Sequence, residues 1–139
     1  MTYERVLVAV DLSAECGQVI ERARSIAAAP HCIVLVHVVQ PVPVTFAGES
    51  FIEPAALFEE EMQAAREGME RMLQQTGLPR GEVLAGDPKA SIHRLAEEME
   101  AEVIVVGSHG RHGLALLLGS TANGVLHGAP CDVLAVRLR

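Results

Sequence analysis

The sequence predicts an α/β fold: a single open, five-stranded, mostly parallel sheet with helices on both faces. Runs of Val, Ile and Leu alternate with helical stretches, and uninterrupted apolar runs are typical of strands covered on both faces. Half of the 139 residues are hydrophobic, which is enough for a substantial core. The length is that of one domain, so we expect residues 1–139 to form a single unit with right-handed crossovers.

The first strand and helix are indicated at the start of the chain. Residues 5–10 (RVLVAV) form the expected strand. Ser13 is a good N-cap, and a helix is predicted over residues 14–29. Pro30 ends this helix, because proline cannot continue the hydrogen-bond ladder.

The second strand and helix follow a similar pattern. Residues 33–39 (IVLVHVV) form the expected strand, and Pro54 suits the first turn of a helix over residues 55–76. The apolar residues of this helix recur at spacings of four and three, which indicates one buried stripe. They are Phe58, Met62, Ala65, Met69 and Met72.

A weaker strand over residues 81–85 leads into the turn Gly86-Asp87-Pro88 and a third helix. Its inward residues are Ile92, Leu95, Ala96 and Met99. Residues 103–106 (VIVV) form the fourth strand and run into a glycine loop.

The last helix and strand complete the predicted fold. The helix opens at Gly119 or Ser120 and reaches about His127, where Gly128 and Pro130 close it. Residues 133–136 form the fifth strand. Lying at the sheet edge, this strand leaves backbone groups unpaired.

Composition excludes several function classes. A formal charge of −7 opposes binding to a nucleic-acid backbone. Only three Phe, one Tyr and no Trp are present, too few for base-stacking platforms. No apolar run reaches membrane-spanning length, and residues 1–11 lack the pattern of a secretory leader. The three scattered cysteines are interpreted as reduced packing residues of a cytoplasmic protein.

The glycine loop is the strongest candidate for a binding site. It reads Gly107-Ser108-His109-Gly110-Arg111-His112-Gly113, and Gly119-Ser120-Thr121 follows at a helix start. Glycines let backbone N–H groups approach an anion closely. A helix N-terminus adds free donors, Ser120 and Thr121 add hydroxyls, and Arg111 adds a cation. These features favour phosphate binding over a plain turn.

Other kinds of site are incomplete. The sequence has no G-x-x-x-x-G-K-S/T pattern and no glycine fingerprint after the first strand, so neither a P-loop hydrolase nor a dinucleotide fold is indicated. His109 and His112 lack further metal ligands and are interpreted as phosphate-facing or solvated. His37 is interpreted as a satisfied core or pocket-edge residue. Asp11 suggests a phospho-accepting receiver domain, but the acidic partner of Asp11 and the phosphorylatable Asp expected at the end of the third strand, near residues 82–86, are both missing.

Characteristic motifs follow one another along the whole chain. They are VLVAVDLS at the start, VLVHVV at the second strand, GDP before the third helix, and VIVVGSHGRHG with LLLGSTANGVLHGAPCDVLAVR at the end. Together they resemble the universal stress proteins. The resemblance implies a strand order of 3-2-1-4-5 and an adenine nucleotide bound across the ends of the first and fourth strands. It also implies a homodimer through the last strand, over residues 132–138.

The resemblance assigns roles to individual residues. Asp11 would accept hydrogen bonds from the ribose hydroxyls, Ala9 and Val10 would line the base, and Val38 would contact the adenine edge through its backbone. Val106 and Gly107 would border the sugar and the first phosphate. The phosphates would be held by Gly110, Gly119, Ser120 and Thr121.

The glycine spacing leaves the nucleotide open between ATP, with accompanying Mg²⁺, and AMP. Nucleotide-binding relatives commonly place nine residues between the second and third glycines, whereas here eight separate Gly110 from Gly119. The leading hypothesis is a nucleotide-binding module that senses or regulates in a stress response, without catalysis. The rivals are a slow ATPase or self-phosphorylating enzyme with Ser120 or Thr121 as acceptor, and a scaffold dimer with an empty loop.

Overall fold

The computed structural model describes residues 2–41, 54–109 and 124–139. Within these residues, five strands form one sheet in the order β3-β2-β1-β4-β5, and all neighbouring strands are parallel. The predicted α/β fold and strand order are therefore confirmed. The strands are β1 (Val6–Ala9), β2 (Ile33–Val39), β3 (Arg80–Ala85), β4 (Val103–His109) and β5 (Asp132–Leu138).

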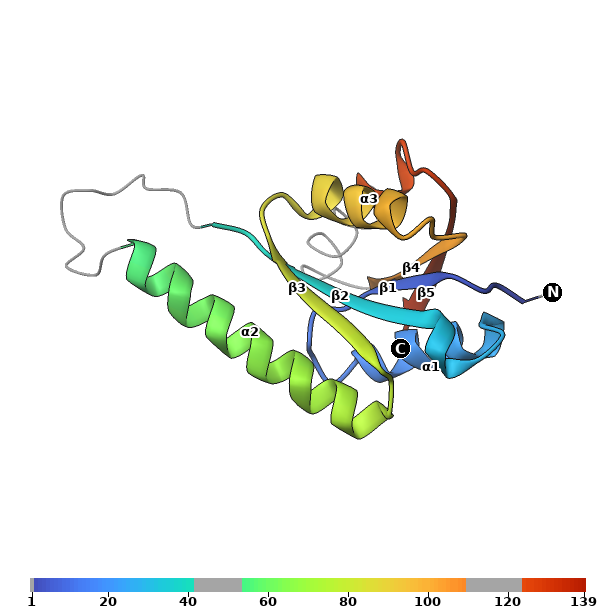
Figure 1. Ribbon diagram of the computed structural model, residues 1–139, viewed down its shortest axis with the longest axis horizontal. Coiled ribbons are helices and arrows are strands. Elements are labelled where there is room, and N and C mark those ends of the chain that lie inside the picture. Colours follow the sequence, from blue (N-terminus) through green and yellow to red (C-terminus); the bar gives the residue numbers. More distant parts are fainter. Residues whose placement is uncertain (1, 42–53, 110–123) are drawn as a thin grey trace.

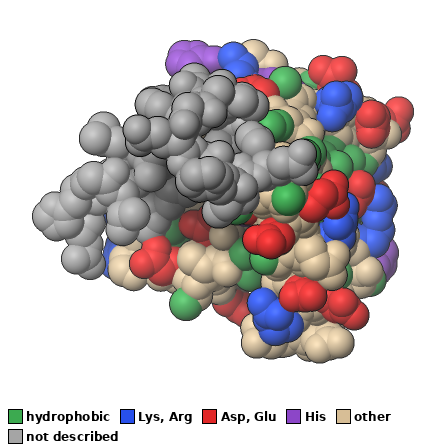
Figure 2. Space-filling view, turned by 90° about the vertical axis from the view of Figure 1, so that its left-hand side faces the viewer, with side chains coloured by type: hydrophobic (Ala, Val, Ile, Leu, Met, Phe, Trp, Pro, Cys, Tyr) green, Lys and Arg blue, Asp and Glu red, His purple; other side chains and the backbone are tan. Residues whose placement is uncertain are grey.

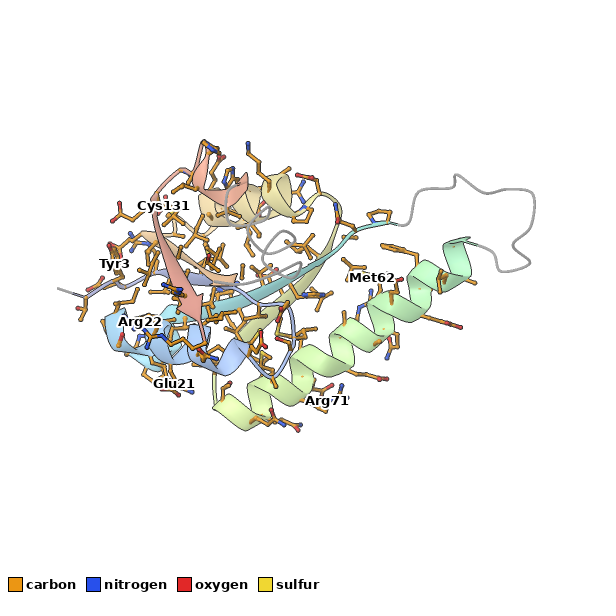
Figure 3. All side chains as sticks on the ribbon, turned by 180° about the vertical axis from the view of Figure 1, so that it is seen from behind. Tyr3, Glu21, Arg22, Met62, Arg71 and Cys131 are labelled. Atoms are coloured by element: carbon orange, nitrogen blue, oxygen red, sulfur yellow. The ribbon has the colours of Figure 1, made fainter. Side chains whose placement is uncertain are left out.

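Helices cover both faces of this sheet (Figure 1). The helices α1 (Cys16–Ile26) and α2 (Pro54–Thr76) lie on one face, and α3 (Pro88–Glu98) lies on the other. A short 3-10 helix, η1 (Pro30–Cys32), precedes β2, and residues 124–126 are helical. Figure 3 shows Met62 pointing from α2 toward the sheet and Arg71 pointing away from it, as the predicted stripe requires.

The strands are apolar throughout because both of their faces are buried. In β1, Val6 and Val8 pack toward α1, and Leu7 packs toward α3. All three are 0% exposed. β4 divides in the same way, with Val103 and Val105 on the α1 side and Ile104 and Val106 on the α3 side. Successive side chains of these strands thus enter two different hydrophobic cores, one on each face of the sheet, and neither face of these strands is exposed to solvent.

Helix α1 is shorter than the sequence predicts. It begins at Cys16 after the N-cap Glu15, so the prediction that Ser13 caps this helix is wrong. The Ser13 N–H and hydroxyl both donate to Asp11 Oδ1 instead, at 3.0 and 2.6 Å. The helix ends at Ile26, whose carbonyl accepts from Tyr3 N–H at 2.7 Å. A contact with the N-terminal segment therefore replaces the last predicted turn.

Strands β4 and β5 are longer than predicted, because they pair with each other along their full length. The register runs from Val103 opposite Asp132 to His109 opposite Leu138. Among the described residues, β5 has only β4 as its neighbour in the sheet, so its other side is an edge, as predicted. In the described part of the chain, no helix is long and apolar enough to cross a membrane.

Candidate functional site

A pocket opens at the carboxyl ends of β1, β2 and β4, on the face that α3 covers. Its volume is about 120 Å³. In the order β3-β2-β1-β4-β5, the chain runs from β1 toward one edge of the sheet and from β4 toward the other, so a switch point lies between β1 and β4. Open α/β sheets bind ligands at such switch points. The pocket is lined by Ala9, Val10, Asp11, Val36, His37, Val38, Pro88, Ile92, Val106 and Gly107.

The end of β1 exposes backbone groups of β2 to this pocket. Val10 N–H donates to the Val36 carbonyl at 2.9 Å, so the backbone groups of Val36 face β1. The Val39 carbonyl accepts from Gly86 N–H at 3.0 Å, on the opposite side of β2. Because backbone groups alternate along a strand, the N–H and C=O of Val38 point to the side of β1, beyond the end of that strand.

Asp11 occupies the turn between β1 and α1. Its Oδ1 accepts three hydrogen bonds, from Ser13 N–H at 3.0 Å, from the Ser13 hydroxyl at 2.6 Å and from the Cys16 thiol at 2.8 Å. Leu12 between them has a φ of 65°, a conformation that costs a non-glycine residue about 1–2 kcal/mol. The three hydrogen bonds hold the Asp11 carboxylate in one orientation, although the backbone conformation of the neighbouring Leu12 is unfavourable.

The ionisation of Asp11 and Cys16 is coupled through their hydrogen bond. Burial tends to raise the pKa of Asp11, but the bonds from Cys16 and Ser13 outweigh it, and the pKa lies below its ordinary value. Burial, followed by the neighbouring Asp11 carboxylate, raises the pKa of Cys16 to about 11. At neutral pH the pair is thus a carboxylate and a thiol donor, and Cys16 is not a reactive nucleophile.

His37 adds a hydrogen bond at the edge of the pocket. Its Nδ1 lies 2.8 Å from the carbonyl oxygen of Val10. Since a carbonyl can only accept, Nδ1 carries the proton and donates. His37 also lines a wider groove of about 450 Å³ between β2 and α2. That groove is lined by Leu12, His37, Val38, Val39, Gln40, Glu61, Ala64 and Ala65.

Gly107 lies inside β4, which corrects the prediction that the glycine loop begins there. It pairs with Val136 of β5. A Cβ on Gly107 would meet Leu138 Cδ1 and Val19 Cγ2, both at 3.1 Å. The absence of a side chain is therefore explained by packing against β5 and α1. The Gly107 backbone nevertheless lines the pocket.

The comparisons with known proteins agree on one family. The family model described as "Universal stress protein family" matches residues 2–137. The chain belongs to the universal stress proteins.

Individual relatives cover the whole chain. Universal stress protein A homolog 1 of Coxiella burnetii is 39% identical over 143 residues, covering 100% of this chain and 99% of the relative. Universal stress protein UspA from Lactobacillus plantarum has a TM-score of 0.74 and 25% identity, and covers 99% of each chain. A universal stress protein solved in complex with cAMP has a TM-score of 0.57 and 25% identity, and covers 98% of each chain.

In this universal stress protein, about half of the predicted site residues come together in the pocket. Those lining it are Ala9, Val10, Asp11, Val38, Val106 and Gly107. His109 is the last residue of β4, opposite Leu138. The others lie outside the described residues: Gly110, Arg111, Gly119, Ser120 and Thr121. Among the residues that the structure describes, no three His, Cys, Asp or Glu side chains gather as a metal site.

Sequence reasoning missed three lining residues, Val36, Pro88 and Ile92. It interpreted His37 as a core or pocket-edge residue but did not assign it to the site. Val36 and His37 were placed correctly on a strand, but which backbone groups a strand leaves free depends on where its neighbour ends. Pro88 and Ile92 come from α3, where Asp87 caps the helix by accepting from Ala90 N–H at 2.9 Å. The Gly86-Asp87-Pro88 turn was a usable signal, since it brings the start of a helix to the carboxyl edge of the sheet.

Proposed function

We propose that this universal stress protein binds an adenine nucleotide at the carboxyl edge of its sheet, as a regulatory module without catalysis. The observation that carries the proposal is the pocket that Val38 lines beyond the end of β1. From the alternation of β2, the N–H and C=O of Val38 face this side. The relative solved with cAMP supports an adenine ligand.

The pocket suits the base of a nucleotide. Its volume of about 120 Å³ is below the ~300–1,000 Å³ of sites that enclose a drug-sized ligand, so sugar and phosphates would extend out of it. Apolar side chains of Ala9, Val36 and Ile92 line it, as a flat ring requires. Adenine presents a donor at N6 beside an acceptor at N1, which complement the Val38 carbonyl and N–H. Guanine presents the opposite order at that edge.

The ribose is assigned to Asp11 and the phosphates to the loop after β4. In the described part of the chain, Oδ1 of Asp11 holds all of that carboxylate's hydrogen bonds. Oδ2 therefore remains to accept from a ribose hydroxyl. The proposed phosphate ligands are Gly110, Gly119, Ser120 and Thr121, because free backbone N–H groups and helix N-termini bind anions. Arg111 would supply positive charge.

Two copies of the chain are proposed to pair through β5. In the part of the chain that the structure describes, the strand has a neighbour on one side only, and Val133 and Leu134 are half-buried. An edge of this kind pairs with another chain unless it is covered or blunted, and an antiparallel pairing is self-complementary about a two-fold axis. The described part of the face in Figure 2 carries acidic and basic side chains side by side. It shows no continuous basic patch of the kind that binds a nucleic-acid backbone.

The proposal is tested by identifying the ligand directly. Nucleotides released from the purified protein are identified by mass spectrometry, and the stripped protein is titrated with AMP, ATP and GTP by calorimetry. We expect adenine nucleotides to bind in preference to GTP. Equal affinity for ATP and GTP would contradict the base assignment, and no binding of any nucleotide would leave the scaffold dimer as the better account.

A further inference from the structure

We propose that His37 is a positioning residue for base recognition: it occupies the Val10 carbonyl and so leaves the Val38 N–H free for the ligand. This inference rests on the proposed function and identifies the side chain that keeps the Val38 N–H available to the base. His37 itself would not contact the base.

The ladder between β1 and β2 stops one step early. Val10 N–H donates to the Val36 carbonyl at 2.9 Å, continuing the ladder one residue beyond β1. In a regular parallel ladder, the next bond would run from Val38 N–H back to the Val10 carbonyl. Among the described residues that bond is not formed, and the Val10 oxygen instead accepts from His37 Nδ1 at 2.8 Å.

The imidazole satisfies an acceptor that would otherwise need a partner. Val10 is only 6% exposed, and a buried carbonyl without a hydrogen bond is costly. Without the His37 donor, the Val38 N–H is the group that regular pairing would bring to this oxygen. The N–H would then be withdrawn from the pocket, and the Val38 carbonyl alone would face the base.

Position 37 is suited to this task because its backbone N–H and C=O face β3 and not β1. Backbone groups alternate along a strand, so those of His37 point away from the side to which Val36 and Val38 point, and His37 pairs with Val83 of β3. Its side chain nevertheless reaches the end of β1. The Val10 carbonyl therefore receives a hydrogen bond from a side chain, and no backbone N–H of β2 that faces β1 is needed for it.

The first test needs no nucleotide. Amide hydrogen exchange is followed by NMR in the ligand-free protein for wild type, His37→Leu and His37→Asn. We expect Val38 in the wild type to exchange at least about tenfold faster than in His37→Leu, the factor that one hydrogen bond provides. His37→Asn, which can retain a donor, should resemble the wild type. Equal Val38 exchange in wild type and His37→Leu would overturn the inference.

The second test separates the base from the rest of the ligand. His37→Leu should bind AMP about tenfold more weakly than wild type, the effect of one lost hydrogen bond. Its affinity for ribose 5-phosphate should be unchanged, and His37→Asn should restore AMP binding. An equal loss for both ligands would indicate general disruption and overturn the positioning role.

The two proposals fail in different ways. If the wild type binds no nucleotide, the proposed function fails, while the exchange experiment still decides what His37 does to Val38. If His37→Leu does not fold, the wild type alone remains decisive. Val38 protection equal to that of neighbouring β2 amides would then overturn the inference, and faster exchange at Val38 would support it.

Discussion

The thiol of Cys16 donates a hydrogen bond to Oδ1 of Asp11, with 2.8 Å between the two atoms. Cys16 is 3% exposed and belongs to the core between α1 and the sheet, whereas Asp11 lines the candidate site. The same sulfur accepts from the Asp11 N–H at 3.3 Å. This reciprocal pair fastens the turn after β1 to the first turn of α1.

Removing the Cys16 donor should make the free energy of unfolding less sensitive to a fall in pH. The folded pKa of Asp11 is lowered, so its contribution is present above the ordinary carboxyl pKa and is lost as pH falls through the folded value. We expect Cys16→Ala to reduce the free energy of unfolding by about 1 kcal/mol more at pH 7 than below about pH 3. Chemical denaturation at both pH values measures this, with Cys16→Ser as the control that keeps a donor. A pH-independent difference would show that only packing was lost.

Asp11→Ala should weaken AMP binding by about 1.5–3 kcal/mol, the scale for hydrogen bonds to a charged group. Calorimetry checks this, and 2′,3′-dideoxy-AMP is the control ligand because it lacks the ribose hydroxyls. The substitution should leave the affinity for that analogue nearly unchanged. An unaltered affinity for AMP would return Asp11 to a purely local role in its turn.

Gly107→Val should destabilise the fold by about 1–3 kcal/mol, the usual cost of overpacking. Two neighbours confine the position, Leu138 on β5 and Val19 on α1. Gly17→Ala is the matched control, because a Cβ at Gly17 in α1 meets nothing within 4 Å. It should stabilise the protein by about 0.5–1 kcal/mol through helix propensity. Thermal and urea unfolding compare the two, and a neutral Gly107→Val would refute the packing explanation.

Gly110→Val should abolish phosphate binding in a protein that still folds. Gly110 lies outside the described residues, and this expectation comes from the sequence: a branched side chain would stand where backbone N–H groups must meet the anion. Calorimetry with ATP and AMP and circular dichroism measure affinity and fold together. Retained ATP affinity in a folded variant would show that the loop assignment is wrong.

Leu134→Pro should convert a dimer to a monomer, because proline removes a ladder donor from an edge strand. Light scattering of wild type and variant at micromolar concentration gives the oligomeric state. A monomeric wild type would refute the dimer proposal. A variant that stays folded and dimeric would place the interface away from β5.

The sequence by itself determined the fold class and the order of its elements. Continuous apolar runs such as that of β1 are explained only by burial on both faces, and α2 was bounded within one residue by Pro54 and its apolar stripe. The residues Ala9, Val10 and Asp11 were found for a related reason: the carboxyl edge of a parallel sheet follows directly from where strands end.

Only the tertiary structure decided what the residues at that edge do. Gly107 belongs to β4 because β5, distant in sequence, pairs with it as far as Leu138. Ser13 donates to Asp11 and does not cap α1. The His37 imidazole, and not a backbone N–H of β2, donates to the Val10 carbonyl. Local patterns encode burial and periodicity, whereas hydrogen-bond partners at strand ends are set by contacts between segments that the sequence separates.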